Sequence, residues 1–163
     1  SSTMLISLPT GSKMFNWLCT YLCAYLKEDV SNNVSVSSMY LKLFLIMFTL
    51  GGSTGLIMGN SVLDISLHDS YYVISHFHIV LSLGTLLSIL IGVYYYEEYL
   101  LSFIFSITNI LSVYHTKALF IGILVTFMPQ HFLSFITLPR RISDFPDSLN
   151  CWNSLSSLGC SLT

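Results

Sequence analysis

The stretch Ser70–Tyr96, SYYVISHFHIVLSLGTLLSILIGVYYY, contains no Asp, Glu, Lys or Arg. A helix needs about 20 mostly apolar residues to cross a hydrocarbon core about 30 Å thick, and this stretch is long enough. Lipid offers no hydrogen-bond partner to free backbone groups, so a single apolar segment of this kind crosses as a helix. The stretch therefore predicts a membrane-spanning helix, with His76 and His78 inside its apolar run.

The composition of the whole chain supports the same environment. Of its 163 residues, 53% are hydrophobic and only 9% are charged, and the mean hydropathy is +0.73. A soluble domain has about 25% charged residues, so a soluble enzyme is excluded. A nucleic-acid binder and a disordered tail are excluded too, because the chain is apolar, has six Lys and Arg, and carries a net charge of −2. The protein is therefore expected to be integral to a lipid membrane.

Hydropathy along the chain predicts an all-α transmembrane bundle with four spanning helices. A further helix is expected to start near 151–163, where the chain is too short to cross. The apolar segment Leu100–Leu111 follows Glu97 and Glu98, and we interpret it as an interfacial loop or a poorly anchored extension. The four spans are expected at about residues 3–26, 39–58, 70–96 and 114–136.

Four spans place alternate loops on opposite sides of the membrane. The loops Lys27–Ser38 and Glu97–Val113 would share one side, and the loops Asn60–Asp69 and Leu138–Asn150 the other. Most candidate polar chemistry falls in this second pair of loops. Polar chemistry is therefore expected at one membrane face.

The two histidines within the third span are rare residues for such a position. An α-helix turns about 100° per residue, so the side chains of His76 and His78 point roughly 200° apart and cannot bind one metal together. One interpretation is that each is an axial ligand of a separate haem iron, with Phe77 between them. The other is that both are hydrogen-bonded core residues.

Charged pairs flank the spans. His68 and Asp69 could bind a divalent ion if another chain completed the shell. On these residues alone, an N-terminal helix cap at Asp69 is the favoured alternative. Arg140 and Arg141 follow Pro139, where the fourth span ends. They are either interfacial anchors or partners for carboxylate groups such as haem propionates.

Lys13 lies about ten residues into the first span, next to Thr10 one helical turn earlier. A buried ammonium group is costly in hydrocarbon, so it tends to line water or a proton path. The alternative is a lysine that snorkels to the interface. The depth of Lys13 favours the proton path.

Five motifs, in order along nearly the whole chain, resemble the core-subunit family of haem–copper oxidases, subunit I of cytochrome c oxidase. The block from His68 to His78 combined with Pro139-Arg-Arg is highly specific. The motifs are PTGSK at 9–13, GGSTG at 51–55, NSVLDISLHDSYYVISHFH at 60–78, FMPQHF at 127–132 and PRRISDFPD at 139–147.

This resemblance implies roles for the haem-facing residues. His76 is expected to be the axial ligand of the high-spin haem a3, and His78 one axial ligand of the low-spin haem a. Phe77 would lie between them on the electron route. The resemblance also implies that Arg140 and Arg141 hold the haem propionates, with Asp64 and Tyr71 as neighbours.

The resemblance also implies an ion site and a proton path. His68 and Asp69 match the magnesium ligands of the family, near the subunit II interface. Lys13 and Thr10 match its lysine-type proton channel. His131 and Trp152 receive no role.

The family subunit has twelve spans, and residues 1–163 resemble the eighth to the eleventh with the start of the twelfth. The chain is therefore expected to be a C-terminal-half piece of the core subunit. It is either encoded as a separate fragment, which we favour, or cut from a longer chain. The copper B ligands would lie on the missing portion, so the enzyme would act only when assembled with it. Expected partners are that N-terminal portion, subunits II and III, accessory subunits and cytochrome c, in the mitochondrial inner membrane.

The implied reaction is the reduction of O2 to water with electrons from cytochrome c and coupled proton pumping. One alternative is the core subunit of a quinol oxidase, which shares these residues. Another is a haem-free structural subunit. The intact histidine, arginine and lysine motifs argue against the haem-free alternative.

The proton-path assignment leads to a prediction for the variant Lys13→Met. Removing the ammonium group should slow oxygen consumption by the assembled complex while both haems remain, because only proton delivery is changed. Unchanged turnover in this variant would remove the proton-path assignment.

Overall fold

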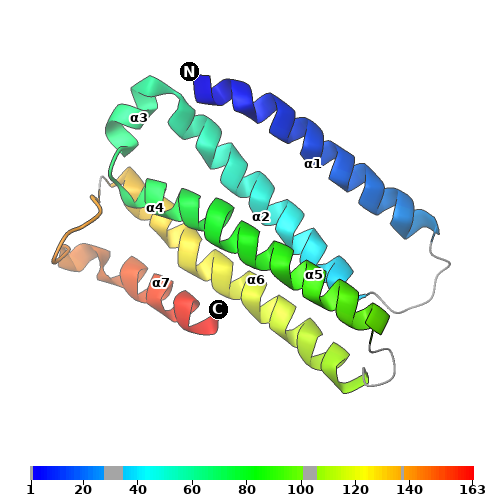
Figure 1. Cartoon of the computed structure of the whole chain (residues 1–163). Coiled ribbons are helices and arrows are strands. Elements are labelled where there is room, and N and C mark those ends of the chain that lie inside the picture. The colour runs from blue at the N-terminus through cyan, green and yellow to red at the C-terminus, as the bar shows by residue number, and fades with distance from the viewer. Residues whose placement is uncertain (1, 28–34, 101–105, 137) are drawn as a thin grey trace.

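The computed structural model describes residues 2–27, 35–100, 106–136 and 138–163, and these ranges contain no β-strand. The expected all-α transmembrane bundle is confirmed (Figure 1). The main helices are α1 (Ser2–Lys27), α2 (Val36–Gly59), α3 (Ser61–Leu67), α4 (Tyr71–Phe77), α5 (Gly84–Leu100), α6 (Ser106–Phe135) and α7 (Asn150–Leu162). A π-helix, η1 (His78–Leu83), joins α4 to α5, and a short 3₁₀ helix, η2 (Asp147–Leu149), precedes α7.

Three described helices are long and apolar enough to cross a membrane: Val36–Gly59, Tyr71–Glu97 and Ile110–Phe135. The last of these begins earlier than residue 114, because α6 already starts at Ser106. The interpretation of Leu100–Leu111 as a loop is therefore wrong for Ser106–Leu111, because these residues already form the beginning of α6. Residues 101–105 lie outside the described residues.

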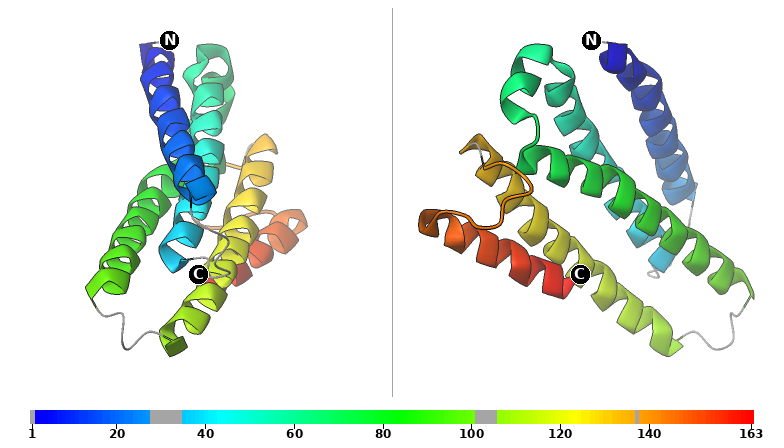
Figure 2. Two further views of the ribbon diagram at one scale, coloured as in Figure 1. Left: turned by 90° about the vertical axis from the view of Figure 1, so that its right-hand side faces the viewer. Right: turned by 60° about the vertical axis from the view of Figure 1, so that its left-hand side comes forward.

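Helix α1 is continuous from Ser2 to Lys27, although Pro9 lies inside it. Its first half carries several hydroxyl groups and Lys13, so it is less apolar than the three spans above. It runs beside α2 over nearly its whole length (Figure 2). Trp17 packs against Phe44 with ring centroids 6.0 Å apart, and the hydroxyl groups of Ser38 and Tyr21 are 3.2 Å apart. A fourth crossing by α1 remains a prediction.

The core lies between α2, the η1–α5 segment and α6. Close approach of α2 to η1 depends on Gly51, because a Cβ atom there would lie 2.6 Å from Val80 Cγ2 and 2.9 Å from Ile79 Cγ2. The π-helix begins at His78, directly after the α-helical turn that carries His76. The buried core side chains are Val36, Tyr40, Leu43, Met47, Ile79, Leu83, Leu87, Leu119 and Ile123.

Two polar loops meet at one end of the bundle, as expected from four alternating spans. Ser70 and Pro139 form an antiparallel bridge. The backbone N–H of Arg140 donates to the Asp69 carbonyl at 2.8 Å, and that of Tyr71 donates to the Leu138 carbonyl at 3.3 Å. The segment before α4 and the segment after α6 are therefore held together by main-chain hydrogen bonds.

Helix α7 covers the region where a further helix was expected, and it packs along α6 (Figure 1). Gly159 permits this contact, because a Cβ atom there would lie 2.5 Å from the backbone nitrogen of Thr126. Ser156 Oγ donates to the Thr126 carbonyl at 3.0 Å. The end of the described chain therefore runs back along the fourth predicted span.

The position of α1 beside α2 predicts that α1 also crosses the membrane. In a background with the native cysteines replaced by serine, a membrane-impermeant maleimide should label Ser2→Cys from the same side as Ser61→Cys. It should label Leu26→Cys only from the opposite side, since α1 and α2 run antiparallel. Labelling of Ser2→Cys and Leu26→Cys from one side would instead place α1 along the interface.

Candidate functional site

His76 is half-buried on α4 and faces α2. Its Nδ1 atom lies 2.9 Å from the Gly51 carbonyl oxygen and 2.9 Å from Thr54 Oγ1. The Thr54 hydroxyl donates to that same carbonyl at 2.7 Å. A carbonyl only accepts, so the neutral ring carries its proton on Nδ1 and leaves the Nε2 lone pair for a ligand.

Gly55 leaves room for the imidazole of His76. A Cβ atom at this position would lie 2.9 Å from Cε1 and 3.6 Å from Nε2. Nε2 has no hydrogen-bond partner among the described residues. Gly55 therefore packs directly against the imidazole, and a larger residue at this position would have to displace the ring.

His78 faces a different helix. Its Nδ1 lies 2.8 Å from the Ile74 carbonyl of the preceding turn. Its ring stacks on Phe127 of α6, with centroids 5.9 Å apart and an angle of 24° between the planes. The centroid of the Phe77 ring lies 4.3 Å from that of His78. The two imidazoles thus lie on different faces, as their spacing predicts. In each ring Nδ1 lies on a backbone carbonyl, so Nε2 is the nitrogen that remains for a ligand.

The polar end of the bundle brings three of the predicted residues together. Arg140 Nε lies 2.7 Å from Asp69 Oδ1, and His68 Nε2 lies 3.6 Å from Asp69 Oδ2. The Arg140 side chain is 26% exposed, whereas those of His68 and Asp69 are 72% and 58% exposed. Water screens an ion pair of this kind, so it contributes about 1 kcal/mol or less to stability.

The alternative role of Asp69 as the N-cap of the following helix is wrong. Ser70 is the N-cap of α4, and its side chain accepts a hydrogen bond from the backbone N–H of Tyr72. Asp69 instead has a left-handed backbone, with φ of 53°, and its carboxylate points to Arg140. A neighbouring serine fits the cap, which leaves the carboxylate free for charged partners.

The remaining predicted residues surround this end. Arg141 is exposed and also left-handed, with φ of 62°. Asp64 is half-buried in the first turn of α3, where its carbonyl accepts from the His68 N–H at 2.8 Å. Tyr71 packs against the small cluster of Leu133, Leu138 and Leu149.

The predicted magnesium site and the predicted proton path each rest on only two residues of the described chain. In the described ranges no group of three or more His, Cys, Asp or Glu residues could hold a metal ion. His68 and Asp69 would therefore need ligands from elsewhere. Lys13 is exposed on α1, and Thr10 Oγ1 donates to the Ile6 carbonyl of its own helix at 3.0 Å.

Sequence reasoning missed several polar residues around the histidines. The partners of His76 lie in the GGSTG motif, which resemblance identified without assigning roles. His131 received no role, yet it is buried and lies 2.8 Å from Ser75 Oγ. These contacts join helices distant in sequence, so no local pattern signals them.

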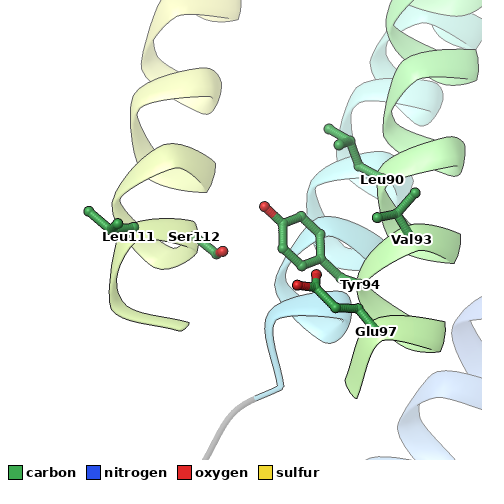
Figure 3. Close-up of a pocket in the computed structure, with 6 residues that line it drawn as sticks. All are labelled: Leu90, Val93, Tyr94, Glu97, Leu111 and Ser112. Atoms are coloured by element: carbon green, nitrogen blue, oxygen red, sulfur yellow. The ribbon is translucent and has the colours of Figure 1, made fainter. Parts of the chain in front are cut away.

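A cavity of about 230 Å³ opens between α5 and α6, away from all of these residues (Figure 3). The side chain of Tyr94 extends from α5 toward Ser112, and the Glu97 carboxylate lies beside Tyr94. The cavity is lined by Leu90, Val93, Tyr94, Glu97, Leu111 and Ser112. None of the predicted site residues lines it.

Comparisons with known proteins agree with the motif resemblance. The family model described as cytochrome c and quinol oxidase polypeptide I matches residues 1–162. Cytochrome c oxidase subunit 1 of Plasmodium berghei is 47% identical over all of the chain, and that of Yarrowia lipolytica is 42% identical over 98% of it. The protein of that name from Theileria parva is 41% identical over 98% of the chain. The chain spans about a third of the length of these curated relatives, 28–33%.

The space at Gly55 predicts a specific effect of Gly55→Ala. The added methyl group should displace the His76 ring from the Gly51 carbonyl and destabilise the protein by about 1–3 kcal/mol, as overpacking does. Gly52→Ala is the matched control, because a Cβ atom there meets nothing within 4 Å. Thermal unfolding in detergent measures both variants. Equal stability of the two would contradict the close packing of His76.

Proposed function

The chain belongs to the cytochrome c and quinol oxidase polypeptide I family, and on this premise we propose that it forms part of the catalytic core of a respiratory cytochrome c oxidase. The activity would be the reduction of O2 to water with electrons from cytochrome c and coupled proton pumping. The observation that carries the proposal is the pair His76 and His78. Each has Nδ1 on a backbone carbonyl and Nε2 without a partner among the described residues.

The histidines fit haem ligation. Haem iron supplies the electron transfer and oxygen chemistry, and an axial imidazole tunes it. Through Nε2, His76 would hold the iron of haem a3 and His78 that of haem a. A hydrogen bond from Nδ1–H to a carbonyl fixes the ring orientation and makes Nε2 a stronger donor to a metal. Contact of Phe77 with the His78 ring supports its proposed place between the two centres.

The charged end of the bundle suits the haem propionates. Arg140 and Arg141 would bind these carboxylates, for which the guanidinium fork is well shaped. Asp69 would hold Arg140 in place through the ion pair at 2.7 Å. Asp64 and Tyr71 would be their neighbours on α3 and α4.

His68 and Asp69 would contribute two ligands to a magnesium site. Both side chains are more than half exposed, so ligands from a partner subunit can reach them. Mg²⁺ prefers oxygen ligands and keeps several waters, which suits a shell that these two residues only partly fill. Subunit II is the proposed source of further ligands.

Lys13 and Thr10 would take part in proton delivery to the oxygen site. Lys13 is exposed on the described chain, and Thr10 is half-exposed one turn away. We propose that the rest of the core subunit packs over this face of α1 and turns it into the lining of a proton path. The ammonium group would then hold or pass a proton inside the bundle.

The activity requires other polypeptides. The copper B ligands would lie on the remaining, N-terminal portion of subunit I. Subunits II and III, accessory subunits and the donor cytochrome c complete the proposed assembly, which would lie in the mitochondrial inner membrane. The exposed apolar side chains of the described helices fit a membrane setting, where they would face lipid or the other subunits.

A quinol oxidase is the second candidate, because the description of the matching family includes quinol oxidases. The relatives cited above carry the name cytochrome c oxidase subunit 1, which favours cytochrome c as the donor. A haem-free structural subunit is disfavoured, since it would have no use for the pair His76 and His78 together with the arginines at the end of the bundle.

The ligand assignment predicts that His76→Ala abolishes the carbon-monoxide-sensitive high-spin haem signal and leaves some low-spin haem. Absorption difference spectra of the assembled complex measure both signals. His115→Gln is the control, because His115 lies on α6 outside the proposed site and glutamine can still hydrogen-bond the buried Tyr40 hydroxyl. A His76→Ala complex with an unaltered high-spin signal would refute the assignment.

A further inference from the structure

A buried polar pair links α4 to α6 beside His78. Ser75 is fully buried, and the His131 residue is 9% exposed. Ser75 Oγ lies 2.8 Å from His131 Nδ1, and both atoms contact the carbonyl oxygen of Phe127, at 3.1 Å and 2.8 Å. Three polar groups from two helices therefore meet at one point inside the bundle.

The direction of these hydrogen bonds follows from the carbonyl, which only accepts. The Ser75 hydroxyl donates to it across the helix interface, and His131 Nδ1–H is directed to the carbonyl and to Ser75 Oγ. A buried polar group without a partner costs about 1–3 kcal/mol, so this arrangement favours one relative position of the two helices.

The carbonyl belongs to the residue whose ring stacks on His78. His78, the first residue of η1, follows Ser75 of α4 by three residues, and Phe127 and His131 are four apart on α6, so each pair lies on one helix face. The His78–Phe127 stack and the Ser75–His131 contact are thus adjacent layers of one interface. The ring of Tyr72 also packs edge-to-face against His131, with the two ring centroids 4.9 Å apart.

Helix α6 lacks one of its own backbone hydrogen bonds close to this contact. Pro129 lies inside the helix between Phe127 and His131. Proline has no N–H, so the backbone hydrogen bond to the Val125 carbonyl is missing there. The side chains of Ser75 and His131 hold the next part of the helix through the Phe127 carbonyl.

We propose that Ser75 and His131 are positioning residues for His78: by fixing Phe127 against the imidazole, they set the plane in which His78 presents Nε2. The inference rests on the proposed function, in which His78 binds the low-spin haem. It assigns a role to two residues that are not themselves ligands. Residues behind a ligand orient it and thereby tune the metal centre.

The test uses the intact oxidase complex isolated from its membranes. The readout is the electron paramagnetic resonance spectrum of the oxidised low-spin haem, whose g values depend on the planes of the axial imidazoles. Ser75→Ala removes the hydroxyl that crosses the interface. His131→Phe keeps a ring but loses the N–H, whereas His131→Asn keeps an N–H close to the position of Nδ1. Ser37→Ala is the matched control, since Ser37 is a buried serine whose hydroxyl donates to the Ile91 carbonyl between other helices.

We expect Ser75→Ala and His131→Phe to shift and broaden the low-spin g values while haem content stays unchanged. Ser37→Ala should leave the spectrum as it is, and His131→Asn should shift it less than His131→Phe. If the His131→Phe complex does not assemble, Ser75→Ala decides the question by itself. An unchanged spectrum in Ser75→Ala, with low-spin haem present, would overturn the inference and leave the proposed function intact. Absence of low-spin haem from the unmutated complex would instead overturn the proposed function.

Discussion

Hydrogen bonds from imidazole Nδ1 atoms to backbone carbonyls are the interactions on which the interior of this bundle depends. In an apolar environment an unpaired N–H group is costly, and a helix carbonyl is the nearest acceptor. His76, His78 and His131 all have this contact, at 2.8–2.9 Å. For the two proposed ligands, the contact also fixes which nitrogen is left for a metal.

Close helix packing makes these contacts possible. Gly51 and Gly55 let α2 approach η1 and the His76 ring, and Ser75 fits between α4 and α6 because its side chain is small. At the polar end, main-chain hydrogen bonds bring Asp69 beside Arg140 before any cofactor is considered. The chain therefore has two histidines in its interior and a charged end on one side, an arrangement that would suit the proposed haem with its propionates directed toward that side.

Much of this arrangement could be predicted from the sequence, because it depends on local properties. Apolar length predicts the helices, alternation of spans brings the two polar loops together, and the spacing of His76 and His78 predicts their divergence. The N-cap at Ser70 was not predicted, since Asp69 is an equally suitable cap residue. The Ser75–His131 contact joins residues 56 positions apart, so only the packing of α4 on α6 makes it visible. The crossing of α1 and the roles of the ligands depend on the rest of the assembly.

The most direct test of the account is a reduced-minus-oxidised absorption spectrum, with and without carbon monoxide, of the native complex isolated through this chain. The account predicts two haem a-type signals, one of which shifts with carbon monoxide. Haem b-type bands would contradict the haem a assignment and favour a quinol oxidase. A complex that contains this chain and no haem would contradict the central claim, because His76 and His78 would then be core histidines without a metal.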